Sequence, residues 1–110
     1  MEKLRIYQSA LDLIAEVYIF IRIDKELSRD YSLVDQIKRA SISIAANIAE
    51  GYCRTGKEFR NYLRIASGSA NEVVALLQII ERVYELNTLK LQEDFKYLGR
   101  QINSLSKQIK

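Results

Sequence analysis

The sequence predicts an all-α protein: an up-down-up-down antiparallel four-helix bundle formed by a single domain over residues 1–110. The chain contains no proline and only four glycines, so long stretches of good helix formers run without interruption. Apolar residues recur at alternating steps of three and four in four segments, and no segment shows the alternation typical of a strand. The connections between these segments are short, which makes neighbouring helices antiparallel.

Four helices are expected, near residues 3–25, 32–50, 56–86 and 89–109, and each carries one apolar stripe that predicts its buried face. The stripes are Leu4, Tyr7, Leu11, Ile14, Tyr18 and Ile21 in the first helix; Val34, Ile37, Ile44 and Ile48 in the second; Phe59, Leu63, Ala66, Ala70, Val73, Leu77, Ile80 and Tyr84 in the third; and Leu91, Phe95, Leu98, Ile102, Leu105 and Ile109 in the fourth.

Several residues predict where the helices end. Gly51 suits the left-handed residue that ends the second helix. The run "TGKE" has the pattern of a capping box, with Thr55 as the N-cap and Glu58 reaching back. Asn87 can end the third helix.

The first and third helices carry more apolar surface than a monomeric bundle needs. The third helix would be roughly 45 Å long against roughly 30 Å for the second, and it has a second apolar stripe. A wide core stripe would explain these residues, but apolar faces of this extent rarely stay in water, so we favour a subunit interface. The interface residues are predicted to be Leu13, Val17, Phe20, Tyr62, Ile65, Leu76, Ile79 and Val83.

Polar side chains share one face of the second helix at the spacing of a core stripe. If the third helix folds back antiparallel, Arg39 lies near Ser69 and Glu72, and a buried Arg39 needs such an acid as its partner. Glu50 could instead meet Arg54, Arg60 or a tyrosine. We predict an Arg39–Glu72 contact within a set of buried polar groups that fix the helix register. This set is Gln36, Arg39, Ser43, Asn47, Glu50, Ser69 and Glu72.

The composition excludes most common catalytic and metal sites. The chain has no histidine and one cysteine, Cys53, so it cannot form a His/Cys zinc cluster, an internal disulfide, a Cys–His dyad or a Ser-His-Asp triad. Glu50 and Glu72 could form an acid/base pair, but they are expected several helical turns apart. We therefore predict no catalytic residue, no metal and no cofactor.

The same composition indicates where the protein is found. A lone Cys53 is best explained as a small packing residue, and it fits a reducing cytoplasm. No uncharged run approaches the ~20 apolar residues of a membrane span. We expect a cytoplasmic protein with no membrane partner.

Charge is distributed unequally along the predicted bundle. The end where the second helix turns into the third carries eight bases against three acids, and the opposite end carries five bases against eight acids. A positive rim of this kind predicts binding to nucleic-acid phosphates, and the alternative is a solvated surface that serves solubility. The predicted nucleic-acid-binding residues are Lys3, Arg5, Arg54, Lys57, Arg60, Arg64, Lys107 and Lys110.

The runs "LVDQIKRASISIAANIAEGYCR" and "EFRNYLRIASGSANEV" resemble the four-helix bundle family of proteins encoded in intervening sequences of bacterial 23S rRNA genes. The specific core is the N-I-A-E-G run, Asn47 to Gly51. The resemblance implies a homo-oligomer, typically a pentamer, with no established enzymatic activity. It also implies similarity to the accessory protein of diversity-generating retroelements, which binds a reverse transcriptase and nucleic acid.

These observations lead to one functional hypothesis and two alternatives. We expect a non-enzymatic homo-oligomer that binds nucleic acid, with RNA as the favoured class, through the basic rim. A protein-binding adaptor or scaffold without nucleic-acid affinity is the main alternative. An enzyme is the weakest hypothesis, because the chain lacks candidate chemistry.

Overall fold

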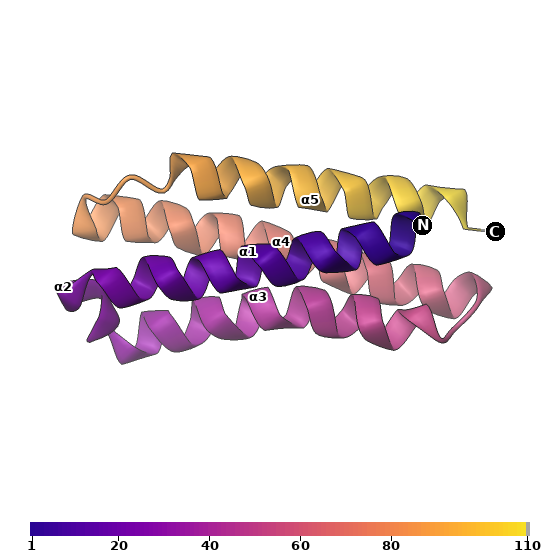
Figure 1. Cartoon of the computed structure of the whole chain (residues 1–110), viewed down its shortest axis with the longest axis horizontal. Coiled ribbons are helices and arrows are strands. Elements are labelled where there is room, and N and C mark those ends of the chain that lie inside the picture. The colour runs from indigo at the N-terminus through magenta and orange to yellow at the C-terminus, as the bar shows by residue number, and fades with distance from the viewer. Residues whose placement is uncertain (110) are drawn as a thin grey trace.

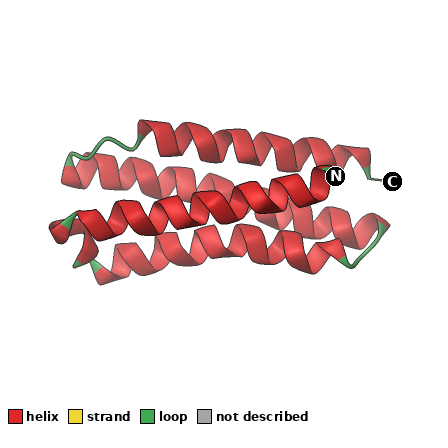
Figure 2. Ribbon diagram, viewed as in Figure 1, coloured by secondary structure: helices red, strands yellow, loops and turns green. Residues whose placement is uncertain are grey.

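The protein is helical throughout the part of the chain that the structure, a computed structural model, describes, residues 1–109. Five helices form within this range: α1 (Glu2–Ile23), α2 (Lys25–Ser28), α3 (Tyr31–Tyr52), α4 (Gly56–Tyr84) and α5 (Leu89–Gln108). Figure 2 shows the helices joined by short loops, with no strand over residues 1–109. The predicted all-α class is confirmed.

The four long helices lie side by side in a bundle of 45 × 21 × 19 Å. Each packs against two neighbours, in the closed order α1, α3, α4, α5 and back to α1. Successive long helices run in opposite directions, and the two chain termini lie at the same end as the turn between α3 and α4 (Figure 1).

The short helix α2 was not predicted and occupies much of the expected connection between residues 25 and 32, while α1 ends at Ile23. Two aspartates explain these helix boundaries. The Asp24 carboxylate accepts a hydrogen bond from the Leu27 amide at 2.8 Å, and the Asp30 carboxylate accepts one from the Leu33 amide at 3.2 Å. Each therefore starts a new helix as an N-cap. Leu27 is fully buried, and α2 packs against α4, so it covers part of the helix that was expected to be longer than its neighbour.

The core confirms the predicted stripes of α3, α4 and α5 but not that of α1. Leu4 and Leu11 are exposed, whereas a second stripe of α1, which was assigned to the subunit interface, supplies Leu13 and Val17 to the core. Both stripes have the same spacing, so periodicity alone could not decide which one faces inward. The buried residues of α1 are Ile6, Ala10, Leu13, Val17 and Ile21.

Helix α4 is the longest element and the most central. By length and composition it is apolar enough to cross a membrane, but 56% of its most apolar 18-residue stretch is buried inside the bundle. Its buried residues face α3 on one side and α5 on the other, as a core helix requires.

The turn between α3 and α4 differs from the sequence prediction. Gly51 is still helical, and α3 continues to Tyr52, while the left-handed glycine is Gly56, with φ 56°. Thr55 is the N-cap of α4, but its side chain makes no capping hydrogen bond. Glu58 binds Arg54 instead of reaching back, so the predicted capping box does not form.

Gly51 is required by the close approach of α4 rather than by its backbone angle. A Cβ atom at this position would lie 2.8 Å from the Cβ of Tyr62 and 2.9 Å from Cδ1 of Phe59. Atoms next to the backbone cannot move away freely, so the two helices are this close only because residue 51 has no side chain.

We predict that Gly51→Ala destabilises the protein by about 1–3 kcal/mol, because the added methyl group overpacks this contact. Gly68→Ala is the matched control, since a Cβ there would meet nothing within 4 Å and Gly68 lies inside a helix. It should stabilise the fold by about 1 kcal/mol. Urea denaturation of both variants measures the two effects. A Gly51→Ala variant with the same free energy of unfolding as the wild type would contradict the close approach.

Glu81 organises the turn between α4 and α5. Its carboxylate accepts one hydrogen bond from the Thr88 amide and another from the Thr88 hydroxyl, each at 2.9 Å. The Thr88 hydroxyl in turn accepts a hydrogen bond from the Gln92 side chain at 2.8 Å. Helix α4 ends at Tyr84, followed by Glu85 in a left-handed conformation, so Asn87 does not end it. The hydrogen bonds from the amide and then the hydroxyl of Thr88 lower the pKa of Glu81 below 4.5.

A carboxyl group with a lowered pKa in the folded state stabilises the fold while it is ionised, and this contribution is lost as the pH falls through the lowered value. We expect the free energy of unfolding to decrease below about pH 4.5, and Glu81→Gln to flatten that decrease. Glu85→Gln is the control, because Glu85 is an exposed neighbour. Urea unfolding at several pH values tests this, and equal pH profiles for wild type and Glu81→Gln would contradict it.

Candidate nucleic-acid interface

The polar face of α3 lies at the surface rather than in the core. The Arg39 side chain is 79% exposed and pairs with Asp35 at 2.9 Å, one turn earlier on its own helix. Glu72 is exposed, so the predicted Arg39–Glu72 contact is wrong. A pair of this kind in water avoids the desolvation cost of a buried charge and contributes only about 0.3–0.5 kcal/mol. Gln36 and Glu50 are exposed as well.

The polar contact between α3 and α4 is smaller than predicted. The Ser43 and Ser69 hydroxyls lie 2.8 Å apart, and the Asn47 amide donates to the Ser43 carbonyl at 2.8 Å and to its hydroxyl at 3.0 Å. Ser69 is buried, and Ser43 and Asn47 are half-buried. Neutral hydrogen bonds therefore link the two helices close to the predicted register.

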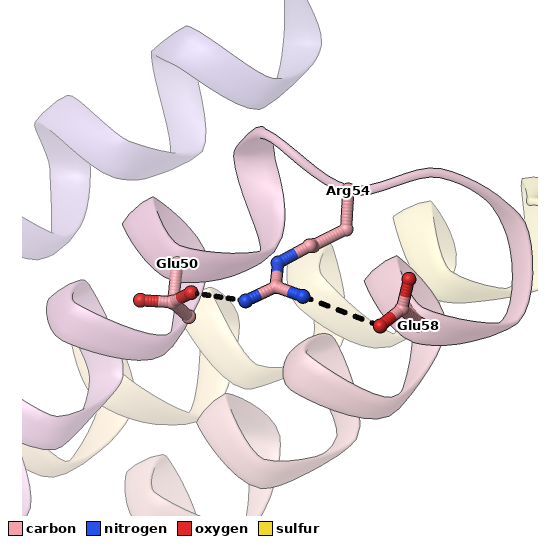
Figure 3. Close-up of polar contacts among 3 residues, drawn as sticks. All are labelled: Glu50, Arg54 and Glu58. Carbon is pink, nitrogen blue, oxygen red and sulfur yellow. Dashed lines mark hydrogen bonds and ion pairs between the residues drawn. The ribbon is translucent and has the colours of Figure 1, made fainter.

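At the basic end, Arg54 is held between two acids. Its guanidinium binds Glu50 at 2.7 Å and Glu58 at 3.2 Å, across the turn that joins α3 to α4 (Figure 3). It also lies over the Tyr62 ring, 5.6 Å from the centre. These contacts, with the Glu50 hydrogen bond first, raise the pKa of Arg54. Arg54 therefore fastens the turn, and its charge is largely compensated.

Two further bases at this end make contacts within the bundle. The Lys3 ammonium lies over the Tyr52 and Phe59 rings, at 5.0 and 5.2 Å from their centres. Arg60 donates to the Ile109 carbonyl at 2.9 Å, where α5 ends. A cation is favourable at that position because the carbonyls of a helix C-terminus carry partial negative charge.

The other predicted bases remain exposed. Within residues 1–109, none of them pairs with an acid, and each lies near the start of α1, the start of α4 or the end of α5. These helix ends meet at the end of the bundle that carries the two termini (Figure 1). Lys110 lies outside the described residues. The exposed bases are Arg5, Lys57, Arg64 and Lys107.

Acidic residues outnumber basic residues at the opposite end. Asp30 accepts a hydrogen bond from the Tyr84 hydroxyl at 2.6 Å. This hydrogen bond lowers the pKa of Asp30 and, together with burial, raises the pKa of Tyr84 to about 12. Lys90 pairs with Asp94 at 2.8 Å, so one of the few bases at this end is compensated. The charge polarity inferred from the sequence therefore exists in the folded bundle.

The predicted interface residues divide into two groups. Leu13, Val17 and Leu76 are buried in the core of the single chain, so their assignment to a subunit interface is wrong, and Phe20 and Tyr62 are half-buried. The wide core stripe, which was the alternative explanation, accounts for the burial of Leu76. The exposed apolar residues of α4, which we call the α4 face, are Ile65, Ile79 and Val83.

A second apolar surface, which the sequence did not reveal, lies between α1 and α3. This α1–α3 groove has an almost wholly apolar lining and contains Cys53, whose thiol is exposed rather than packed as predicted. Exposed Leu11 and Ile42 extend the apolar surface along the same two helices. The groove is lined by Leu4, Tyr7, Ala49, Tyr52 and Cys53.

The fold and its surface define a small helical-bundle protein with one basic end and two exposed apolar surfaces. The chain belongs to the 23S rRNA-intervening sequence protein family, whose model matches residues 2–110. The predicted family resemblance is thus confirmed.

A solved structure shows the same fold. It is the crystal structure of a protein of unknown function from the S23 ribosomal protein family of Bacteroides thetaiotaomicron VPI-5482, with a TM-score of 0.86 and 22% sequence identity. The alignment covers 97% of this chain and 99% of that chain. No curated protein matches the sequence.

Proposed function

We propose that this chain forms a homo-oligomer that binds nucleic acid, with RNA as the favoured class, and that it acts by binding rather than by catalysis. The observation that carries this proposal is the charge polarity of the bundle. Among residues 1–109, Arg5, Lys57, Arg64 and Lys107 are exposed at one end and pair with no acid, whereas acids predominate at the other end.

Oligomerisation would strengthen this charge. In a ring every subunit contributes its basic end to the same rim, which focuses the positive field and raises phosphate affinity through multivalency. The exposed bases are lysine ammonium and arginine guanidinium groups, and both bind phosphate. Binding should therefore follow the nucleic-acid backbone, and the affinity should fall steeply as the salt concentration rises.

The apolar surfaces support self-association. The α4 face and the α1–α3 groove are different surfaces of one chain, and contact between unlike surfaces builds a ring when the rotation closes. The pentameric state is our inference from the family resemblance.

We expect light scattering after gel filtration to give a mass of about five times 12.7 kDa for the wild type. Ile65→Asp combined with Val83→Asp should reduce the mass towards that of one chain, because both side chains are exposed in the monomer and a charge there opposes burial. Circular dichroism checks that the variant remains folded. A folded wild-type monomer at micromolar concentration would refute self-association.

Reversing two exposed bases at the basic end should abolish RNA binding. The variant is Arg64→Glu with Lys107→Glu, and Arg60 is left unchanged because it holds the end of α5. Each lost phosphate contact reduces the dependence of affinity on salt, and two reversals remove about two contacts and add repulsion. Fluorescence anisotropy with a structured RNA at low and high salt measures the effect.

The control variant is Lys25→Glu with Arg29→Glu, which makes the same charge change at the acidic end. It should bind RNA almost as well as the wild type. If both double variants lose affinity equally, only net charge matters and the basic end is not the site.

A protein-binding adaptor is the second candidate, and the α1–α3 groove favours it. This groove is apolar and open, as is typical of surfaces that receive a helix from another protein. Wild-type protein that binds no nucleic acid even at low salt would make the adaptor the better explanation.

A further inference from the structure

The outer surface where α4 and α5 meet carries bases and amides. The two helices pack directly, since Arg60 binds the Ile109 carbonyl and a Cβ atom at Gly99 would lie 3.8 Å from Ala70. We call this surface the basic seam. It comprises the exposed residues Arg64 and Asn71 of α4 and Lys96, Arg100, Asn103 and Lys107 of α5.

Helical spacing places these side chains on the same surface. The four residues of α5 are separated by four, three and four positions, so they share one face. Asp94, Tyr97 and Gln101 line a hollow against α1. The face with Lys96 and Arg100 therefore lies on the other side of α5, next to α4.

The basic seam contains almost no acid. Helix α5 has no acidic residue after Asp94. Between residues 59 and 80 the only acid of α4 is Glu72, which lies three positions after Ser69 on the side that contacts α3. Glu93 approaches Lys96 at 3.7 Å, but only at the far end of the seam. A phosphate backbone laid along the seam would meet cations and amide donors.

Tyr97 stands at the edge of the basic seam. Its side chain is 58% exposed, and the Arg100 guanidinium carbon lies 5.8 Å from the centre of its ring. An exposed aromatic ring beside cations is the arrangement with which proteins stack unpaired bases while they hold the adjoining phosphates.

We propose that the basic seam and Tyr97 bind single-stranded nucleic acid, with the backbone along α4 and α5 and a base stacked on Tyr97. The proposal rests on the proposed function and extends it by naming the form of nucleic acid. The seam from Lys96 to Lys107 spans roughly 16 Å, which is the length of about five stacked nucleotides.

The geometry favours a single strand over a duplex for two reasons. The bases of a duplex are stacked on one another and cannot reach an aromatic ring without being unpaired. Both α4 and α5 are packed along their whole length in the bundle (Figure 1), so neither protrudes to enter a major groove.

The hollow beside Tyr97 sets the direction in which the nucleotide faces. It is lined by Asp12, Glu16 and Asp94, which repel phosphate. The backbone must therefore stay on the Lys96 and Arg100 side of the ring. The edge of the stacked base then points towards the carboxylates, which accept hydrogen bonds from base N–H groups, including the ring N–H of uracil and thymine.

Fluorescence anisotropy with three probes tests this proposal: single-stranded oligouridine and oligothymidine of about fifteen nucleotides, and an RNA duplex of the same length. We expect both single strands to bind at least tenfold more tightly than the duplex at low salt. Tyr97→Ala should weaken single-strand binding by about tenfold, and Tyr97→Phe should restore it, because the ring rather than the hydroxyl stacks. If one of the two single strands binds more tightly, that result identifies RNA or DNA as the preferred ligand.

Tyr31→Ala is the matched control, because Tyr31 is also strongly exposed but lies at the acidic end. It should leave affinity unchanged. Wild type that binds every probe equally, with no effect of Tyr97→Ala, would overturn this inference while leaving the proposed function intact. Wild type that binds no probe would refute both. A weakened Tyr97→Ala variant that Tyr97→Phe does not rescue would overturn the stacking role.

Discussion

The close approach of α3 and α4 is the constraint on which the rest of the structure depends. At Gly51 no side-chain atom separates α3 from Tyr62 and Phe59. Further along the contact between α3 and α4, two serine hydroxyls meet at 2.8 Å. Small residues at both contacts let the helices approach closely enough for α4 to bury several stripes. The register fixed here determines where every later residue of α4 lies, and through α4 it determines the position of α5.

The same register determines which charges remain available. Because the turn after α3 is tight, Glu50 and Glu58 both reach Arg54, and the base nearest the turn is compensated. Arg60 is used to hold the last carbonyls of α5. The positive potential of this end therefore comes from residues farther out, such as Arg64 and Lys107, which are exposed and form no ion pair within residues 1–109.

Sequence periodicity predicted the class and three of the four core stripes, because in α3, α4 and α5 the longest apolar stripe is the one that faces the core. It was wrong for α1, where two stripes of equal spacing compete and only the packing against α3 and α5 decides between them. The N-cap signals of Asp24 and Asp30 were present in the sequence and would have revealed α2. The exposure of Arg39 could not be predicted, since Asp35 and Glu72 are equally plausible partners until the helix faces are known.

The two flanks of α4 suit different roles. The α3 side carries the exposed apolar residues of the α4 face, whereas the exposed residues on the α5 side include bases and amides. A subunit that used the α4 face and the α1–α3 groove for assembly would bury the apolar flank and leave the basic seam in solvent. Under these proposals, self-association and nucleic-acid binding would use different surfaces. In a closed ring the seams would repeat at equal intervals, so a single strand long enough to reach two of them would gain affinity from each.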